Sequence, residues 1–144
     1  MTIVPIGSDH AGYELKERLK EFLKELGFEP KDYGTFSEDS CDYPEFAHHV
    51  CDFIKEHPGS KGILICGSGN GISMAANKHQ HIRAALSWTP EIAELGRLHN
   101  DANIVSLPAR FVDLETAKAI VKIFFETEFE GGRHQRRVDK IPAC

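Results

Sequence analysis

Short apolar runs alternate along the chain with longer stretches in which apolar residues recur every three or four positions. The runs 63–65 and 102–107 are almost wholly apolar, as strands buried on both faces are. The longer stretches have the spacing of amphipathic helices. The pattern predicts strands at 3–6, 28–33, 63–65, 82–86 and 102–107, and helices at 11–26, 44–56, 72–78, 90–99 and after Asp113.

Glycine and proline set the ends of these elements. Gly27 stops the first helix, and Pro44 and Pro90 fit first helical turns. Pro30 interrupts the second strand, which places that strand near a sheet edge. Pro5 conflicts with a central position for the first strand, because proline cannot donate a backbone hydrogen bond.

Strands that alternate with helices predict a parallel sheet covered on both faces, a three-layer α/β/α Rossmann-like domain formed by residues 1–144. In such sheets ligands bind beyond the carboxyl ends of the strands, where the strand order reverses. Asp9 and His10 follow the first strand, and the segment 66–71 follows the third. If these two strands are neighbours, both segments meet at one site.

The segment Cys66-Gly-Ser-Gly-Asn-Gly71 is a glycine-rich turn between a strand and a helix. That order directs backbone N–H groups at one point, which suits a developing oxyanion and favours the thiolate form of a nearby cysteine. Ile72 excludes three familiar motifs, because a Walker A loop, a dinucleotide fingerprint and a Cys-x5-Arg phosphatase loop each need another residue there. The alternative is an inert buried thiol followed by an ordinary glycine turn.

Composition narrows the class of protein. The 144 residues are 41% hydrophobic and 27% charged, with a net charge of −5, which argues against a general nucleic-acid surface. No apolar run approaches the roughly 20 residues of a membrane span, and the first residues lack a signal-peptide pattern. The cysteines at 41, 51, 66 and 144 show no Cys-x-x-Cys spacing, so we expect reduced thiols in a cytoplasmic protein without a membrane partner.

Basic residues gather near the carboxyl end of the chain. Arg133 and Arg137 stand four positions apart and would project from one helix face, where two guanidinium groups suit a phosphate; the alternative is a solvated basic face. His99 is likewise either an acid or a helix-end histidine, and no ligand set has metal-site spacing. With the thiol and the amide loop, these residues indicate carbon-acid chemistry on a phosphorylated small molecule, without a metal or cofactor.

Seven segments carry a resemblance to a known family: Gly7-Ser-Asp-His-Ala-Gly12, Gly34-Thr, Asp42-Tyr-Pro44, Ile65-Cys-Gly-Ser-Gly-Asn-Gly71, Ala75-Ala-Asn-Lys78, His99-Asn100 and Gly131-Gly-Arg-His-Gln-Arg-Arg137. In this order and spacing the chain resembles type B ribose-5-phosphate isomerase, whose family also contains the galactose-6-phosphate isomerase subunits. The resemblance implies a five-stranded sheet in the order 2-1-3-5-4. It also implies interconversion of ribose 5-phosphate and ribulose 5-phosphate through an enediolate, in the pentose phosphate pathway, without a cofactor.

The resemblance also implies roles by position. Cys66 would be the base that moves the proton between C1 and C2, and His99 the acid in ring opening, with help from Asp9 and His10. The enediolate oxygen would be held by Ser68 and the amides of the loop. The other expected substrate-binding residues are Tyr43, Gly67, Gly69, Asn70, Gly71 and Asn100, with Arg110, Arg133 and Arg137 at the phosphate, the last two in a basic tail from about 130 to 144.

Some alternatives stay open within the resemblance. Family members that lack the cysteine carry a glutamate after the third glycine, where this chain has Ile72, so it resembles the cysteine class. Ser68 and Asn70 are shared with the other class. A hexose-6-phosphate isomerase of allose or galactose type is a second interpretation. A flavodoxin-like domain that binds a phosphorylated ligand without turnover is a third.

Strand polarity adds an expectation about assembly. His99 and Asn100 lie between a helix and the start of the next strand, which in a parallel sheet is the end opposite the Cys66 loop, roughly 15 to 20 Å away. If His99 is catalytic, it must therefore serve the site of a neighbouring subunit. We expect a homodimer with shared active sites, or a dimer of such dimers.

Overall fold

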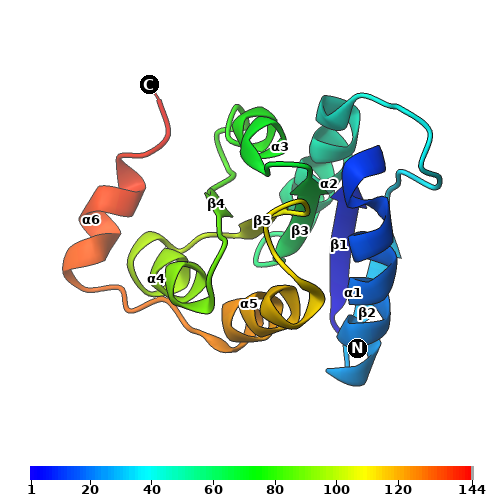
Figure 1. The fold of residues 1–144 in the computed structure, drawn as a ribbon. Helices are drawn as coiled ribbons and strands as arrows, with labels where there is room; N and C mark the ends of the chain where they lie inside the picture. The colour runs from blue at the N-terminus through cyan, green and yellow to red at the C-terminus, as the bar shows by residue number, and fades with distance from the viewer. Residues whose placement is uncertain (144) are drawn as a thin grey trace.

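The computed structural model describes residues 1–143, and Cys144, one of the expected reduced thiols, lies outside the described residues. Strands and helices alternate as the sequence pattern predicts (Figure 1). The elements are β1 (Ile3–Ser8), the 3-10 turn η1 (His10–Gly12), α1 (Tyr13–Glu25), β2 (Glu29–Asp32), α2 (Tyr43–Glu56), β3 (Gly62–Cys66), α3 (Asn70–Ala76), β4 (Ala84–Leu86), α4 (Pro90–Asn100), β5 (Ile104–Pro108), α5 (Leu114–Glu126) and α6 (Arg133–Asp139).

The five strands form one parallel sheet in the order β2-β1-β3-β5-β4, which confirms the expected fold. Side chains that alternate along β3 build two cores. Ile63 and Ile65 pack with α1, α4 and α5 on one face, while Leu64 and Cys66 pack with α2 and α3 on the other (Figure 1). The helix α6 stands outside both layers and packs against α4. Within residues 1–143, no helix combines the length and the apolar character needed to cross a bilayer.

Pro5 lies in β1 although that strand has a neighbour on each side. The carbonyl of Ile6 faces β2, where it accepts from Tyr33 N–H at 2.9 Å, so the adjacent residue Pro5 faces β3. Pairing with β3 begins only at Ile6, which is in register with Ile63. The N–H that proline lacks would therefore point toward β3 at a position before the hydrogen bonds between β1 and β3 begin. For this reason β1 can contain a proline.

The outer edge of the short strand β4 is covered by a side chain. The amide of Asn77 accepts from Ala84 N–H at 2.8 Å and donates to the Ala84 carbonyl at 3.1 Å. It thus occupies the position that a further strand would take. The strand predicted at 82–86 begins two residues later than expected, and Asn77 has a structural role within one of the segments that carry the family resemblance.

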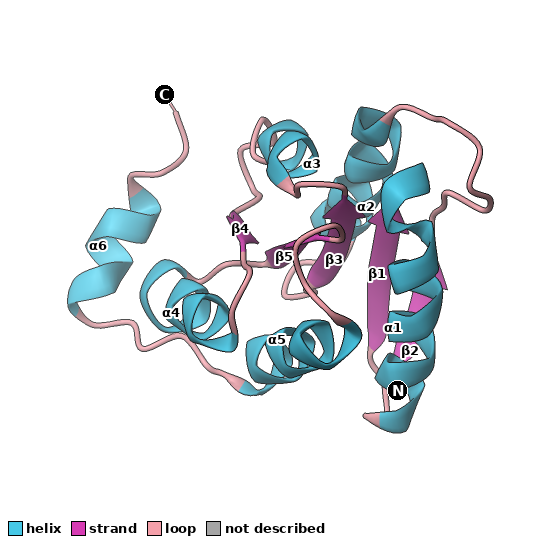
Figure 2. Ribbon diagram, viewed as in Figure 1, coloured by secondary structure: helices cyan, strands magenta, loops and turns pink. Residues whose placement is uncertain are grey.

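A lysine is fully buried between α1 and β2. Nζ of Lys16 lies 2.5 Å from Asp32 and 2.8 Å from Glu17, and Lys20 reaches the same Asp32 oxygen at 2.8 Å. The other oxygen of Asp32 accepts from Gly34 N–H at 2.8 Å, at the start of the long loop 33–42 (Figure 2). Burial alone would raise the pKa of Asp32, but the hydrogen bonds from the two lysines outweigh it and hold that pKa below its ordinary value of 3.8.

Asp32→Asn removes the carboxylate and leaves the Lys16 ammonium buried without its main partner. We expect the free energy of unfolding at neutral pH to fall by about 3 kcal/mol, because a buried charge loses its compensation. The lowered pKa makes this stabilisation full above the ordinary Asp pKa and lost as the pH falls through the lower, folded-state value. Urea unfolding at neutral pH and at about pH 3 should therefore show a smaller acid loss in the variant.

Glu21→Gln is the matched control, since the Lys24–Glu21 pair at 3.1 Å lies on the solvent-exposed side of the same helix. That substitution should change the free energy of unfolding by less than about 0.5 kcal/mol. Equal losses from the two substitutions would contradict a dominant role for the buried pair.

Candidate active site

The carboxyl ends of β1 and β3 lie side by side and open into a cavity of about 530 Å³. This is the point where the strand order reverses, since the chain turns from β1 to β2 on one side and continues with β3 on the other. The two segments that the sequence singled out therefore meet as expected. The cavity is lined by Asp9, His10, Ala11, Tyr43, Cys66, Gly67, Ser68, Gly71, Arg110 and Phe111.

The carboxylate of Asp9 is fixed by the turn that follows it. Oδ1 accepts from Gly12 N–H at 3.1 Å, and the Asp9 N–H donates to the carbonyl of Ile65 at 3.2 Å. A Cβ at Gly12 would lie 2.6 Å from a methyl group of Ile65, so only glycine allows this approach. Within residues 1–143, Oδ2 of Asp9 has no hydrogen-bond partner, so it is the oxygen that remains free to accept a hydrogen bond.

A backbone amide selects the tautomer of His10. The N–H of Cys41 lies 3.2 Å from Nδ1 of His10, and a backbone amide can only donate. Nδ1 must therefore carry the lone pair, which leaves the proton of the neutral ring on Nε2. His10 can thus present a hydrogen-bond donor to a ligand in the cavity.

The glycine loop begins where Cys66 ends β3, and Cys66 is only 5% exposed. Gly69 has a φ of 76°, a left-handed conformation in which a Cβ would lie 2.4 Å from Leu86. The hydroxyl of Ser68 accepts from Asn70 N–H at 3.2 Å. Its own proton remains available for a ligand oxygen.

Tyr43 and Arg110 pack directly on the loop, and both contacts depend on glycine. A Cβ at Gly71 would lie 2.5 Å from the Tyr43 ring, and one at Gly67 would lie 3.1 Å from Nη1 of Arg110. The Arg110 N–H also donates to the carbonyl of Gly67 at 3.0 Å. Arg110 is exposed, and its guanidinium forms no ion pair within residues 1–143, so it can meet an anion in the cavity.

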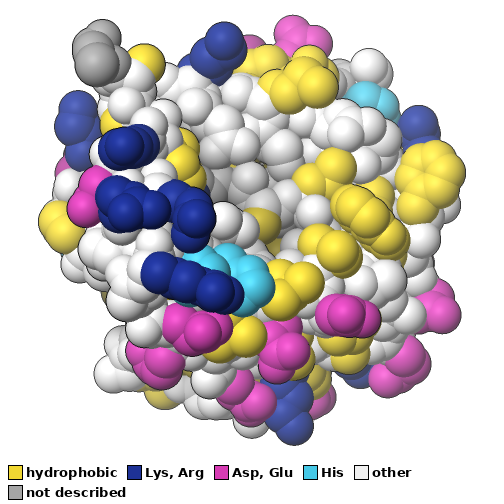
Figure 3. All heavy atoms as spheres, turned by 90° about the vertical axis from the view of Figure 1, so that its left-hand side faces the viewer, with side chains coloured by type: hydrophobic (Ala, Val, Ile, Leu, Met, Phe, Trp, Pro, Cys, Tyr) yellow, Lys and Arg dark blue, Asp and Glu magenta, His cyan; other side chains and the backbone are white. Residues whose placement is uncertain are grey.

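Six of the expected site residues do not line this cavity: Gly69 and Asn70 within the loop itself, and His99, Asn100, Arg133 and Arg137 elsewhere in the fold. His99 is in the last turn of α4, where its ring stacks on that of His134 in α6 at 4.3 Å between centroids. Asn100 lines a separate cavity of about 300 Å³. The exposed basic side chains of α6 form a row on the surface beside histidine (Figure 3).

The three described thiols differ in environment. Cys51 is buried, and burial together with the nearby charge of Asp52 raises its pKa to about 12. Cys41 is half-buried, with its sulfur 3.9 Å from Nδ1 of His10. Cys66 alone joins the strand end to the amide loop. Cys51 is thus an inert core residue, and of the three described thiols only that of Cys66 lines the cavity.

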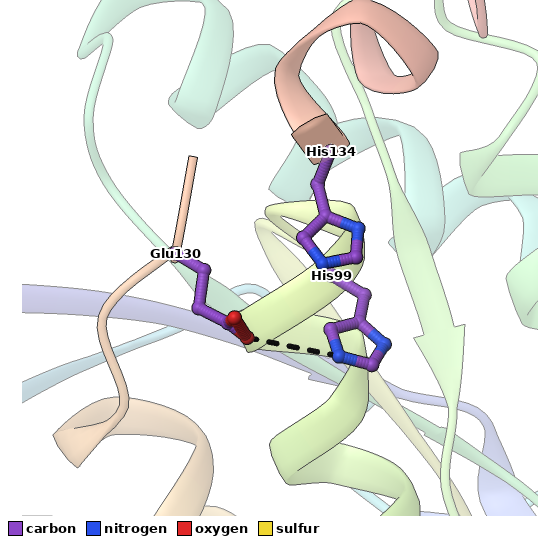
Figure 4. A group of neighbouring side chains, drawn as sticks. All are labelled: His99, Glu130 and His134. Carbon is purple, nitrogen blue, oxygen red and sulfur yellow. Dashed lines mark ion pairs between the residues drawn. The ribbon is translucent and has the colours of Figure 1, made fainter. Parts of the chain in front are cut away.

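Some neighbours of the site were not found in the sequence. Cys41 was interpreted only as a reduced thiol, although its backbone orients His10 across 31 positions of the chain. Phe111 lines the cavity, and Glu130 and His134 surround His99 (Figure 4). His134 had one signal, its place between the two arginines of a segment that carries the resemblance.

The fold and the cavity define an α/β enzyme with a thiol and a carboxylate at the switch point of a parallel sheet. The family model described as Ribose/Galactose Isomerase matches residues 4–141. Ribose-5-phosphate isomerase B of Escherichia coli is 44% identical over 143 residues, which cover 99% of this chain and 96% of that protein. The chain belongs to the ribose/galactose isomerase family, and it is an isomerase.

Two solved structures are similar over almost the whole chain. Ribose 5-phosphate isomerase B of Thermotoga maritima has a TM-score of 0.95 at 48% identity, covering 98% of this chain and 97% of that one. The enzyme of Mycoplasma genitalium, solved with bound ribulose 5-phosphate, has a TM-score of 0.93 at 44% identity, covering 97% and 93% of the two chains. The fold, the strand order and the family thus agree with what the resemblance implied.

Alkylation by iodoacetamide at neutral pH should reach Cys66 and leave Cys51 unmodified. The thiolate is the reacting species, and a pKa of about 12 keeps Cys51 protonated, so its rate should be at least about a hundredfold lower. Cys41 is a competing target, and Cys41→Ser removes it without touching the amide that orients His10. Peptide mass mapping over time measures each rate. Faster labelling of Cys51 than of Cys66 would overturn this assignment of the thiols.

Proposed function

We propose that the chain interconverts ribose 5-phosphate and ribulose 5-phosphate through an enediolate, with Cys66 as the base. The observation that carries the proposal is the meeting of a thiol, a carboxylate and an amide loop at one switch point, in a chain of the ribose/galactose isomerase family. The relative from Mycoplasma genitalium was solved with ribulose 5-phosphate, which supports a phosphorylated pentose as substrate. We place the enzyme in the cytoplasm, consistent with the free thiols of Cys41, Cys51 and Cys66.

The proton transfer uses groups on the loop after β3. The Cys66 thiolate removes the proton from C2 of the open-chain aldose, next to the C1 carbonyl, and returns it to C1. The C2 hydroxyl proton passes to the C1 oxygen, so the carbonyl group moves from C1 to C2. The negative charge that develops on oxygen is met by amides of residues 67–71 other than that of Asn70, which donates to Ser68, and by the free proton of the Ser68 hydroxyl. Such donors stabilise the enediolate more than the neutral sugar, so they lower the barrier.

The groups after β1 bind and open the sugar. Asp9 is held at Oδ1 and presents Oδ2, which suits a sugar hydroxyl, and His10 presents Nε2–H. Tyr43, packed on Gly71, closes the cavity at the loop. Arg110 supplies a guanidinium for the phosphate from the same chain, and its backbone bond to Gly67 keeps the residue beside the loop.

A second subunit would complete the site. His99, Asn100, Arg133 and Arg137 are expected to act on the substrate, yet none of them lines the Cys66 cavity of its own chain. We infer a homodimer in which the α4–α6 region of one subunit brings these residues to the cavity of the other. Arg133 and Arg137 then join Arg110 around the phosphate, and His99 is the acid in ring opening. In this dimer the basic tail of one subunit contributes to the active site of the other.

The surface beside the cavity supports this assembly. A second cavity of about 400 Å³ adjoins it through Ser68 and Phe111 and is otherwise lined by Asn70, Leu86, Trp88 and Pro108. Phe111 is 74% exposed and Trp88 is 52% exposed in the single chain. Exposed aromatic residues at the rim of a ligand site are typical of a protein interface. The apolar rim and the incomplete site thus point to the same partner, a second copy of the chain.

Cys66→Ala should lower kcat for ribose 5-phosphate by at least about a hundredfold, close to 3 kcal/mol of barrier, because the base acts only in the proton-transfer step. Binding of ribose 5-phosphate, measured by calorimetry, should stay within about threefold of the wild type. Formation of ribulose 5-phosphate is the assay, and Cys41→Ser is the matched control that should retain kcat. A variant Cys66→Ala with near-normal kcat would show that the base is another group, with Asp9 the next to test.

The same assay with allose 6-phosphate and galactose 6-phosphate tests the substrate class. Turnover of a hexose 6-phosphate above that of ribose 5-phosphate would reassign the enzyme within its family. No turnover of any aldose phosphate would favour a domain that only binds phosphorylated ligands.

Mixing two inactive variants tests the shared site. Under conditions that exchange subunits, Cys66→Ala and His99→Ala should form mixed dimers in about half of the pairs, each with one doubly damaged site and one intact site. Activity should return to about a quarter of that of the wild type. Subunit exchange is checked by native mass spectrometry. Exchange without recovery of activity would mean that His99 acts on the Cys66 of its own chain.

A further inference from the structure

Three side chains with metal-binding groups meet where α6 docks on α4. They are His99 in α4, Glu130 before α6 and His134 in α6 (Figure 4). One ligand atom from each lies within 4.8 Å of the other two, and Nε2 of His99 is 3.7 Å from a carboxylate oxygen of Glu130. The sequence showed no ligand set with metal-site spacing. His99 is about 30 positions from Glu130 and His134, and only the fold brings the three side chains together.

We propose that His99, Glu130 and His134 form a binding site for a divalent transition metal ion such as Zn²⁺, and that an ion bound there inhibits the enzyme by occupying His99. Two imidazoles and one carboxylate are a donor set that zinc takes, with a fourth position left for water. Calcium and magnesium prefer sites built wholly from oxygen, so the two imidazoles favour a transition metal. The inhibitory effect, unlike the binding, rests on the proposed role of His99.

The geometry requires a small closure around the ion. Ligand atoms in a tetrahedral zinc site lie about 3.3 Å apart, since each bond is about 2.0 to 2.1 Å long. The His99–Glu130 distance of 3.7 Å is already close to this value. The His99 and His134 rings stack at 17° to each other, so one ring must tilt for their lone pairs to converge. Glu130 is half exposed at its side chain and can swing toward the ion.

The residues around the cluster shift the pKa of His134 in both directions. Burial, followed by the proximity of His99 and Arg133, holds the pKa of His134 below its ordinary value, against the effect of Glu130. The lowered pKa favours the neutral form of the His134 ring, which is the form that binds a metal. Nε of Arg133 donates to Nε2 of His134 at 3.4 Å, which shows that this nitrogen offers a lone pair. Arg133 is exposed and can leave for solvent when an ion takes its place.

A second group of histidines supplies the control. Nδ1 of His48 and Nε2 of His79 lie 2.7 Å apart and share a hydrogen bond, while Nε2 of His81 bonds to the carbonyl of Cys51 at 2.8 Å. Two imidazoles without a carboxylate form a poorer site than three ligands. His79→Gln therefore removes one imidazole from the His48–His79 pair and leaves His99, Glu130 and His134 unchanged.

The experiment titrates metal-free protein with ZnCl₂ by calorimetry in a buffer without phosphate, and with CoCl₂ while visible absorption is recorded. We expect one saturable site per chain and the absorption bands of tetrahedral cobalt. Glu130→Gln and His134→Gln should each weaken Zn²⁺ binding at least about tenfold, since even loss of an outer partner of a ligand has that effect. His79→Gln and Cys66→Ala should bind Zn²⁺ as the wild type does; Cys66→Ala is included because a thiolate is also a ligand for zinc.

Inhibition is measured in parallel, relative to the metal-free activity of each variant. Zn²⁺ should inhibit the wild type over the concentration range in which it binds, and excess chelator should restore activity. Inhibition should shift to higher Zn²⁺ concentration in Glu130→Gln and not in His79→Gln. Binding that survives both Glu130→Gln and His134→Gln, or that is lost in His79→Gln or Cys66→Ala, would overturn the site. Zn²⁺ binding at the site without inhibition would overturn the proposal that the bound ion inhibits the enzyme. It would not bear on the isomerase assignment, which the ribose 5-phosphate assay tests separately.

Discussion

The close approach of the loops that follow β1 and β3 is the constraint on which the rest of the site depends. Parallel pairing brings Asp9 N–H to the carbonyl of Ile65 at 3.2 Å, and the η1 turn then lies directly against β3. Gly12 stands at the contact, where a Cβ would come within 2.6 Å of Ile65. A larger residue would push the carboxylate and the thiol apart. Glycine is thus needed here for contact rather than for an unusual backbone conformation.

Two further glycines extend the same constraint around the cavity. Gly71 admits the ring of Tyr43, and Gly67 admits the guanidinium of Arg110, so groups from α2 and from the segment after β5 reach the loop. The loop therefore has two functions, to present its amides and to let neighbouring side chains come close to them. This explains why a stretch with so few side chains can organise a polar site.

The single chain divides its chemistry between two regions. The thiol, the carboxylate and one arginine lie at the switch point of the sheet, whereas His99 and the basic face of α6 belong to the region around α4. Parallel strands and their connecting helices impose this division, because the last turn of α4 precedes β5 and so faces the opposite end of the sheet. In the proposed dimer, a second copy of the chain resolves this division without any change in fold. The same division leaves His99 among groups with their own chemistry, which is why a metal site can arise there.

The sequence by itself determined the sheet, its covering helices and the position of the glycine loop, because buried parallel strands and amphipathic helices each leave a local pattern that can be read over a few residues. It also placed Asp9 and Cys66 at the carboxyl ends of two strands, and the structure showed that these strands are neighbours. Only the tertiary structure decided the burial of Lys16, which lies in a helix of charged residues, and the tautomer of His10, which depends on an amide 31 positions away. It alone brought Glu130 and His134 to His99. Such contacts are set by the packing of whole elements, and no local pattern along the chain records them.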